Sequence, residues 1–310
     1  MTDYSIPVIL FAYNRPDLLA QTLAALRATG VPLLYVFSDG PRTAEHQSAI
    51  AAVRTLLREI DWCDVVLVER EQNLGLGVSI RIGVEEVLKA HDTFIVCEDD
   101  LICVPGTYQY LCAALRYYHD DPRVMSVTAW NHPRITPQNM GEQPYFDGRA
   151  ECLIWGGWCR SWVGMDQDAR TIIERCKQRQ IDVYRYGADL SAMAEREQRQ
   201  NIWAVRWLYL HILNGGLCLR PPHSMVEHIG FDPRATNASN GDFWANPPLR
   251  LCPPIPTRWP VPVEHPACPR LWQMACGRRP RRSFANLSPW VGRVLQKIQR
   301  AVKASTQGGL

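Results

Sequence analysis

The sequence predicts an α/β fold in which a mainly parallel central sheet is flanked by helices. The first observation is periodicity, because short β-type apolar runs alternate with amphipathic segments of helical length from the N-terminus to about Asn131. The second is spacing, because the runs recur at intervals of roughly 30 residues, which suits a strand and a right-handed crossover helix. The third is composition, since 310 residues with 46% hydrophobic and 21% charged side chains describe an ordinary globular protein of one large or two small domains.

The N-terminal half carries the clearest elements. The expected strands cover residues 6–14, 32–40, 64–71, 93–100 and 124–131. The expected helices cover residues 16–29, 43–60, 75–91 and 106–121. Pro16 suits the first turn of a helix, so the first of these helices should begin there.

The second half is less regular. Helix-like segments lie near residues 166–180 and 187–213, and residues 247–269 contain nine prolines, which are too many for a helix or a central strand. We expect an extended wrap or linker there. The expected organisation is an α/β half over residues 1–131, a second half of the same domain over 132–246, a proline-rich wrap or linker over 247–277 and a basic amphipathic tail over 278–310.

Charge is distributed unevenly along the chain. The formal net charge is +3, but no Asp or Glu follows Glu264 whereas nine Lys or Arg do, so the C-terminal region carries +9 and the rest −6. Such a tail favours an anionic partner. Two interpretations stay open, a helix that lies on an anionic membrane surface and a solvated end. Nucleic acid is not expected as a partner, because the basic residues belong to no recognised module.

Two further features bear on the compartment. No run of 18 or more apolar residues occurs, and Met1–Pro7 leads straight into a strand without the basic and apolar regions of a signal peptide. The eleven cysteines are an odd number without a Cys-x-x-Cys pair, which fits buried reduced thiols better than a disulfide framework or a zinc site. We therefore expect a cytoplasmic protein, peripheral at the inner face of the cell membrane if the tail binds there.

Polar residues follow the expected strands. In open α/β sheets, ligands gather beyond the carboxyl ends of the strands, so these residues should share one rim. They are Asn14, Arg15, Asp39, Asn73, Glu98, Asp99, Asp100, Trp130 and Asn131.

The acidic triplet Glu98-Asp99-Asp100 lies between two apolar runs in the stretch TFIVCEDDLICVP. Adjacent carboxylates at a strand end raise one another's pKa unless a cation is present, and Mn²⁺ or Mg²⁺ with oxygen ligands supplies that cation. With a sugar diphosphate, such a metal bridges the phosphates and stabilises the leaving diphosphate. The alternative is a solvated acidic turn, or a helix N-terminus that favours negative charge.

A dinucleotide site is not expected. The first strand is followed by AYNRPD, without the Gly-x-Gly-x-x-Gly loop that cradles a pyrophosphate. The glycines of NLGLGVSIRIG precede a helix in the third crossover instead of the first, and no Walker signature occurs.

Several motifs together resemble one enzyme family. They are PVILFAYNRPDLLAQTLAAL, YVFSDGPR, NLGLGVSIRIG, FIVCEDDLICVPGTYQYLCAAL, DPRVMSVTAWN and GGLCLRPPHSMVEHIGFDPRATNAS. Their order and spacing over residues 6–245 resemble nucleotide-sugar glycosyltransferases of the Rossmann-like GT-A fold, most of all the N-acetylglucosaminyltransferase I group and its bacterial relatives. The resemblance implies a metal-dependent, inverting transfer from a UDP-sugar, of the GlcNAc type, to a glycan, lipid-linked or cell-surface polysaccharide acceptor. It makes residues 1–131 the nucleotide-sugar-binding half and residues 132–246 the acceptor and catalytic half.

The resemblance also implies roles for single residues. Asp100 resembles the single direct protein ligand of the metal, and Glu98 and Asp99 resemble residues that face the ribose and the donor sugar. Arg15 resembles a nucleotide contact, and Asp39 the acceptor of a uracil N–H. The expected substrate-binding set also includes Asn73, Ser79 and Arg81. Without the resemblance, Arg15 and Arg81 would be surface helix cations.

The stretch WGGWCRSW resembles the Gly-Trp loop that lies near donor sugar and acceptor in this family. An indole can stack on the apolar face of a sugar ring, so Trp155 and Trp158 are expected to bind substrate. The alternative is that both rings belong to the hydrophobic core.

The general base is the least determined residue. NIWAVRW, residues 201–207, resembles a helix start at which the family often places an acid ahead of the tryptophan, but here that position is Asn201, and an amide cannot accept the proton. The candidate catalytic residues are Asn201 and the nearby acids Asp232, Glu227 and Glu197. Asp232 ranks first because GFDPRATNASNGDF looks like the family's loop that orders over bound donor. Arg206 is expected to bind substrate.

Three alternatives stay open. A sugar-1-phosphate nucleotidyltransferase also uses a parallel α/β half and acidic metal ligands. It should, however, carry a glycine-rich phosphate loop with a Lys or Arg directly after the first strand, which FAYNRPD does not supply. A non-catalytic glycan- or nucleotide-binding module of the same fold is a second alternative, which the amide at Asn201 leaves open. His228 is either a second metal ligand or a structural histidine with its hydrogen bonds satisfied.

Overall fold

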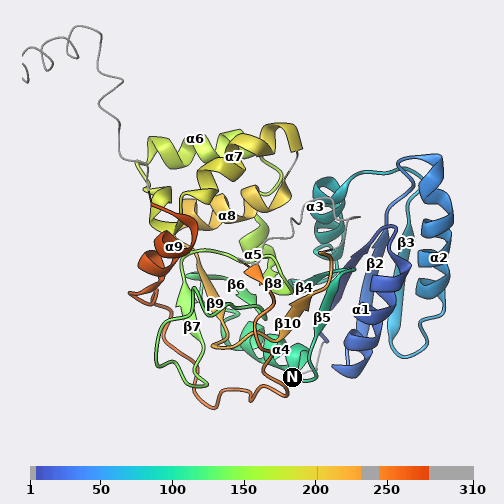
Figure 1. Cartoon of the computed structure of the whole chain (residues 1–310), viewed down its shortest axis with the longest axis horizontal. Coiled ribbons are helices and arrows are strands. Elements are labelled where there is room, and N and C mark those ends of the chain that lie inside the picture. Colours follow the sequence, from blue (N-terminus) through green and yellow to red (C-terminus); the bar gives the residue numbers. More distant parts are fainter. Residues whose placement is uncertain (1–4, 201, 232–243, 279–310) are drawn as a thin grey trace, which may run out of the picture. The chain divides into compact units, whose positions relative to one another are not determined.

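The computed structural model describes residues 5–200, 202–231 and 244–278 (Figure 1). Residues 1–277 form one compact unit. The predicted basic tail lies outside the described residues apart from Arg278, so its contact with a membrane stays a prediction. Among the helices that the structure describes, none is both long and apolar enough to cross a membrane.

An eight-stranded sheet runs through this unit in the order β3-β2-β1-β4-β8-β6-β9-β7. Its first four strands are parallel. They are β3 (Asp64–Glu69), β2 (Leu33–Ser38), β1 (Val8–Ala12) and β4 (Thr93–Glu98). All five residues of β1, VILFA, are buried, which is typical of a parallel strand covered on both faces.

The other half of the sheet is mixed. Strand β8 (Trp155–Trp158) runs antiparallel to both of its neighbours, β4 and β6 (Val124–Thr128). Strand β9 (Leu217–Arg220) is parallel to β6, and β7 (Tyr145–Asp147) is antiparallel to β9. The predicted α/β class with a mainly parallel central sheet flanked by helices is confirmed.

The observed strand β4 is shorter than the strand predicted over residues 93–100. Strand β4 ends at Glu98, because the chain turns at the next two residues and enters β5 (Leu101–Cys103). Strand β5 pairs with β10 (Val226–His228) in a separate antiparallel ribbon. This ribbon lies beside the end of β4 and forms one wall of the site described below.

Helices cover both faces of the sheet (Figure 1). One face packs against α1 (Pro16–Ala28), α2 (Gln47–Arg58) and α4 (Thr107–Tyr117), whose Leu, Val and Ala side chains join one core. The other face packs against α3 (Leu76–Val87) and α8 (Trp203–Asn214) in a second core. The remaining helical elements are α5 (Cys159–Trp162), α6 (Ala169–Gln178), α7 (Asp189–Gln200), α9 (Cys268–Cys276) and the 3₁₀ turns η1 (Ala44–His46) and η2 (Val183–Tyr186).

The proline-rich segment lies against the body through isolated contacts. Leu249 forms a bridge with Ser224, and Glu264 forms one with Phe146. The Tyr118 hydroxyl donates to the carbonyl of Pro260 at 2.6 Å. Residues 268–276, which the sequence pattern groups with this segment, form α9.

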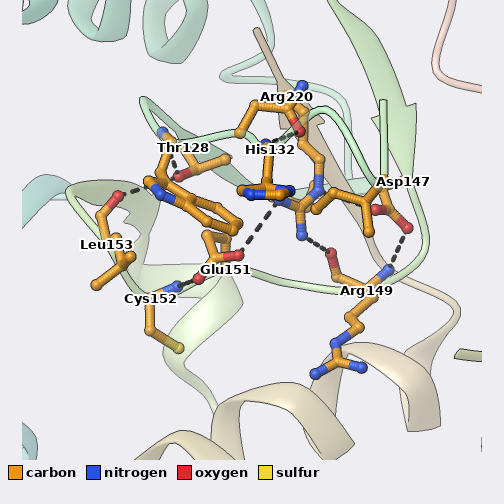
Figure 2. Close-up of polar contacts among 12 residues, drawn as sticks. Thr128, His132, Asp147, Arg149, Glu151, Cys152, Leu153 and Arg220 are labelled. Atoms are coloured by element: carbon orange, nitrogen blue, oxygen red, sulfur yellow. Dashed lines mark hydrogen bonds and ion pairs between the residues drawn. The ribbon is translucent and has the colours of Figure 1, made fainter. Parts of the chain in front are cut away.

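A buried arginine ties α9 to the sheet. Arg220 and Asp147 are both fully buried, and Arg220 Nε donates to Asp147 Oδ2 at 2.8 Å (Figure 2). The same carboxylate oxygen accepts from Trp272 Nε1 of α9 at 2.8 Å. Burial acts to lower the pKa of Arg220, but Asp147 and Glu151 raise it more, so the guanidinium stays charged.

We expect Asp147→Ala to lower the free energy of unfolding by about 3–5 kcal/mol, because it leaves the Arg220 cation buried without its main partner. Urea denaturation followed by circular dichroism measures this change. Glu86→Ala is the control, because it removes an exposed i,i+3 pair with Lys89. Equal midpoints for the two variants would contradict a structural role for the buried pair.

Candidate active site

The candidate site is built on the turn after β4. Glu98 ends the strand, and Asp99 and Asp100 form the turn. The backbone N–H of Tyr13, just beyond β1, donates to Asp99 Oδ2 at 3.0 Å, and Thr22 Oγ1 donates to the Asp99 carbonyl at 3.0 Å. Asp99 and Asp100 are 5% and 7% exposed, so the triplet is not a solvated acidic turn.

One guanidinium group joins two of these carboxylates. Arg15 Nη2 lies 2.9 Å from Asp99 Oδ1 and 2.7 Å from Asp100 Oδ2. Pro16 begins α1 directly after Arg15, which fixes the arginine backbone at the rim. Burial acts to lower the pKa of Arg15, but the two aspartates raise it more. The structure therefore brings Arg15 to the triplet, and its contact with a nucleotide stays a prediction.

The carboxylates carry more negative charge than this guanidinium offsets. Burial raises the pKa of Glu98 to about 8, and the charges of Asp100 and Asp99 add to the effect. Burial raises the pKa of Asp99 to about 6 although Arg15 opposes it. Burial also acts to raise the pKa of Asp100, but His228 and Arg15 outweigh it and hold that pKa below its ordinary value.

Strand β10 closes the site beside Asp100. His228 Nε2 lies 3.4 Å from Asp100 Oδ2, and the backbone N–H of Ile229 donates to the Asp100 carbonyl at 2.9 Å. His228 Nδ1 is buried and has no hydrogen-bond partner among the described residues. At Gly230 a Cβ atom would collide with Asp100 Oδ2, so only glycine lets the backbone approach this carboxylate.

Asp39, just beyond β2, forms the other end of the site. Its Oδ2 accepts the backbone N–H groups of Leu74 and Gly75 at 2.9 and 3.0 Å, and the φ of +73° at Gly75 suits glycine. Its Oδ1 lies 3.6 Å from Arg70 Nη1 and has no hydrogen bond within the described part of the chain. Arg70 also donates to Ser79 Oγ, so it positions both side chains. Asp39 therefore offers one buried acceptor without a donor.

A cavity of about 320 Å³ joins the two ends. Its lining comes from the ends of β1, β2 and β4, the start of α3 and the residues around β10. The sequence-predicted residues that line it are Arg15, Asp39, Asn73, Ser79, Glu98, Asp99 and Asp100. Asn14 of the predicted rim lines it as well, whereas Trp130 and Asn131 do not, because Trp130 belongs to the core and the Asn131 amide donates to the carbonyl of Pro221.

Tyr13 and Arg42 also line this cavity, and the sequence analysis did not single them out. The Tyr13 hydroxyl lies 2.6 Å from His46 Nδ1 and accepts from the backbone N–H of Arg42 at 3.1 Å. Their positions in the sequence could have identified them as cavity residues, since Tyr13 follows β1 directly and Arg42 lies three residues after Asp39.

Trp155 and Trp158 do not form a sugar-binding platform in this structure. Trp155 is 0% exposed, and its ring stacks with Trp162 and Trp203 at centroid distances of 5.9 and 5.6 Å. Trp158 is 2% exposed and donates from Nε1 to the carbonyl of Leu115. Strand β8 lies inside the sheet, where helices cover both faces, so the core interpretation holds.

Two other residues predicted to bind substrate, Arg81 and Arg206, form ion pairs with glutamates. Arg81 Nη1 pairs with Glu85 Oε1 one helical turn away at 3.2 Å, and Arg81 does not line the cavity. Arg206 Nη2 lies 3.7 Å from Glu197 Oε1, and Glu197 is 7% exposed. Glu197 is therefore paired and shielded from solvent.

Glu227 does not point toward the triplet. It precedes His228 on β10, and successive side chains of a strand point to opposite faces. Because His228 faces Asp100, Glu227 faces away, and its Oε1 lies 3.5 Å from Asn246 Nδ2. The other two catalytic candidates, Asn201 and Asp232, lie outside the described residues.

The triplet fits a divalent cation that takes only part of its ligands from the protein and the rest from a bound substrate. Among the described residues, no group of three or more His, Cys, Asp or Glu side chains surrounds one point. Asp100 and His228 do converge, however, and Glu98 and Asp99, whose pKa values burial raises, lie beside them and could lose their protons to a bound cation. Carboxylate oxygens with further oxygen ligands from phosphate and water suit Mn²⁺ or Mg²⁺.

No protein-family model and no curated protein matches the chain. Among solved structures, it is similar to a mannosyltransferase from Pyrobaculum calidifontis in complex with GDP-Man and Mn²⁺, at a TM-score of 0.37 and 16% identity over 56% of this chain and 47% of that chain. It is also similar to a protein from Bacillus anthracis provisionally assigned as a glucose-1-phosphate thymidylyltransferase, in complex with a sucrose, at a TM-score of 0.33 and 8% identity over 52% and 75% of the two chains. The match thus spans about half the length of the mannosyltransferase. At these TM-scores neither structure assigns a function to this chain.

We expect Glu98→Gln to flatten the pH dependence of stability in metal-free buffer. The pKa of Glu98 rises from 4.5 to about 8 on folding, so the folded state binds more protons between these values and the free energy of unfolding falls as pH rises. Urea denaturation at about pH 5 and about pH 8 measures the difference. Identical pH profiles for wild type and Glu98→Gln would contradict this pKa shift.

Proposed function

We propose that the chain is a glycosyltransferase that moves a sugar from a UDP-sugar to a glycan, lipid-linked or cell-surface polysaccharide acceptor. The observation that carries the proposal is one cavity with two chemically different ends. Asp39 supplies a buried oxygen without a hydrogen bond at one end, although Arg70 lies 3.6 Å from it, and the triplet supplies three adjacent carboxyl groups at the other. A sugar nucleotide bound with a divalent cation matches both ends.

The Asp39 end supports a uridine nucleotide. Two backbone N–H groups already occupy Oδ2, which leaves Oδ1 to receive one donor. The single ring N–H of uracil meets that requirement. Guanine presents two adjacent N–H donors, which a carboxylate binds with both oxygens. Adenine and cytosine have no ring N–H in a nucleotide and offer only an exocyclic amino group. The donor sugar is expected to be of the GlcNAc type from the family resemblance alone.

The triplet end supports a metal-bound diphosphate. Asp100 and His228 are the residues that would hold the cation, while Arg15 keeps Asp99 and Asp100 in place. When bound, the cation offsets the negative charge that develops on the departing UDP. Glu98 and Asp99 would then face the ribose and the donor sugar.

The proposed reaction is a single displacement. An acceptor hydroxyl attacks the anomeric carbon on the side opposite UDP, so the configuration at that carbon inverts. A base must take the hydroxyl proton as the new bond forms.

Asp100→Ala should abolish transfer and leave the fold intact. Two unit charges about 4 Å apart interact by about 4 kcal/mol at an effective dielectric constant of 20, which corresponds to a rate loss of about three orders of magnitude. The measurement is UDP release from UDP-sugars with Mn²⁺, with circular dichroism as the check on folding. Asp92→Ala is the control, because that side chain is 74% exposed. Near-normal turnover by Asp100→Ala removes Asp100 from the mechanism, and pyrophosphate release from UTP with a sugar phosphate would indicate a nucleotidyltransferase instead.

UDP-sugars should stabilise the protein in the presence of Mn²⁺, and GDP-sugars should not. A ligand at 100 times its Kd adds about 2.7 kcal/mol to the free energy of unfolding, which a thermal-shift panel detects. Asp39→Ala should weaken the stabilisation by UDP-sugars, because it removes the acceptor for the uracil N–H. Stronger stabilisation by GDP-sugars, or equal binding by Asp39→Ala, would count against this assignment of the base.

A further inference from the structure

An arginine behind the wall of the cavity joins two of the residues that line it. Arg70 follows β3 directly, and its Nη1 donates to Ser79 Oγ and lies 3.6 Å from Asp39 Oδ1. Ser79 and Asp39 both line the cavity, whereas Arg70 does not. Because the two oxygens lie against the same nitrogen atom, they are close enough to face neighbouring groups of one ligand.

Contacts on several sides hold Arg70 in this position. Its backbone N–H donates to the carbonyl of Ser38 at 3.0 Å, and its own carbonyl accepts from Arg54 Nη2 at 2.5 Å. The guanidinium carbon lies 5.1 Å from the centre of the Phe37 ring, which adds a cation–π contact. The side chain is 11% exposed. Arg70 is therefore a fixed part of the wall and can direct the two side chains that it contacts.

The contact with Arg70 decides how the Ser79 hydroxyl is used. A guanidinium only donates hydrogen bonds, so the Ser79 oxygen accepts there and its own proton needs another acceptor. Asp39 Oδ1 is not that acceptor, because it has no hydrogen bond, and no other residue in the described part of the chain accepts the proton. Ser79 is 4% exposed, so the proton can be satisfied only by a ligand or water in the cavity that Ser79 lines.

The two side chains thus offer one acceptor and one donor beside each other. Uracil presents the complementary pair, a ring N–H at position 3 and a carbonyl oxygen at position 4. Cytosine reverses this pair, with a bare ring nitrogen at position 3 and an amino group at position 4. A diphosphate held at the triplet keeps the base from shifting by one atom. Cytosine would therefore turn an acceptor toward the Asp39 carboxylate and a donor toward the Ser79 proton.

Guanine also carries a ring N–H beside a carbonyl group, so this pair of side chains does not exclude it. Its exclusion depends on its amino group, because the backbone N–H groups of Leu74 and Gly75 already occupy Asp39 Oδ2. The selection that Ser79 and Arg70 add is between two bases of equal size, uracil and cytosine.

We propose that Arg70 is the positioning residue for selection of uracil over cytosine, an assignment that rests on the proposed binding of a UDP-sugar. Ser79 donates to the carbonyl oxygen at position 4 of the base, and Asp39 accepts the N–H at position 3. Arg70 directs both side chains without contacting the nucleotide.

The test compares the Kd values of UDP and CDP, measured by calorimetry with Mn²⁺. A pair of hydrogen bonds to a base contributes about ten- to a hundredfold in discrimination, so wild type should bind UDP that much more tightly than CDP. Ser79→Ala should weaken UDP binding without weakening CDP binding. Arg70→Met should reduce the preference in the same way, although Ser79 is intact. Arg58→Met is the matched control and should keep the preference, because Arg58 is 60% exposed and pairs with Glu69.

Each outcome decides the assignment. An equal loss of UDP and CDP binding in Arg70→Met would assign Arg70 a purely structural role and overturns the proposal. An unchanged ratio of the two Kd values in Ser79→Ala also overturns it. If Arg70→Met does not fold, Arg70→Lys carries the test, because it keeps the charge beside Asp39 but not the planar set of donors, and an unchanged ratio in that variant refutes the proposal.

Failure of this proposal can be told apart from failure of the proposed function. Equal Kd values of UDP and CDP in wild type overturn the selection of uracil but leave the transfer reaction standing, since UDP release by wild type and by Asp100→Ala tests that separately. If wild type binds neither UDP nor a UDP-sugar, the proposed function is wrong and the role of Arg70 is wrong with it.

Discussion

The site depends on one electrostatic constraint, three carboxylates in sequence at the end of a buried parallel strand. Like charges at this spacing destabilise the folded chain unless cations or hydrogen-bond donors hold them. Arg15 bridges Asp99 and Asp100, the Tyr13 backbone supports Asp99, and His228 approaches Asp100. The start of α1, the end of β1 and the position of β10 are therefore coupled to the same turn. Burial, with the charges of Asp100 and Asp99, raises the pKa of Glu98, and a divalent cation would favour its ionised form.

The direction of β8 decides which residues of the mixed half lie at the edge where β4 ends. If β8 ran parallel to β4, the residues before it would lie at the opposite edge of the sheet. Its reversed direction instead brings the segment that holds Glu151 to that edge and places the tryptophan-rich strand in the core. Arg220 connects this segment to β7 and α9, because it contacts both Asp147 and Glu151 while Trp272 shares the Asp147 carboxylate. One buried guanidinium thus connects β7, β9, α9 and the segment before β8.

In the proposed function, the two ends of the cavity divide recognition from reaction. Asp39 is fixed by the turn that Gly75 allows, so its free oxygen has a defined direction before any ligand binds. The triplet is fixed less completely, because its charges are offset only in part by the described residues around it. A rigid acceptor suits selection of a nucleobase, whereas a charged and partly compensated turn suits a group that gains negative charge and departs.

The sequence by itself determined the α/β class, most of the elements of the N-terminal half and the polar rim, because strand and helix periodicity and the position of residues after strands are local properties. The sequence therefore identified Arg15, Asp39 and the triplet as rim residues. They follow β1, β2 and β4, which are neighbouring parallel strands in the sheet. Tertiary structure alone decided the direction of β8, and with it the burial of Trp155 and Trp158. It also decided the pairing of Arg206 with Glu197 and the contact of His228 with Asp100, residues separated by 128 positions along the chain. Such contacts depend on how strands from distant parts of the chain pair, which no local pattern encodes.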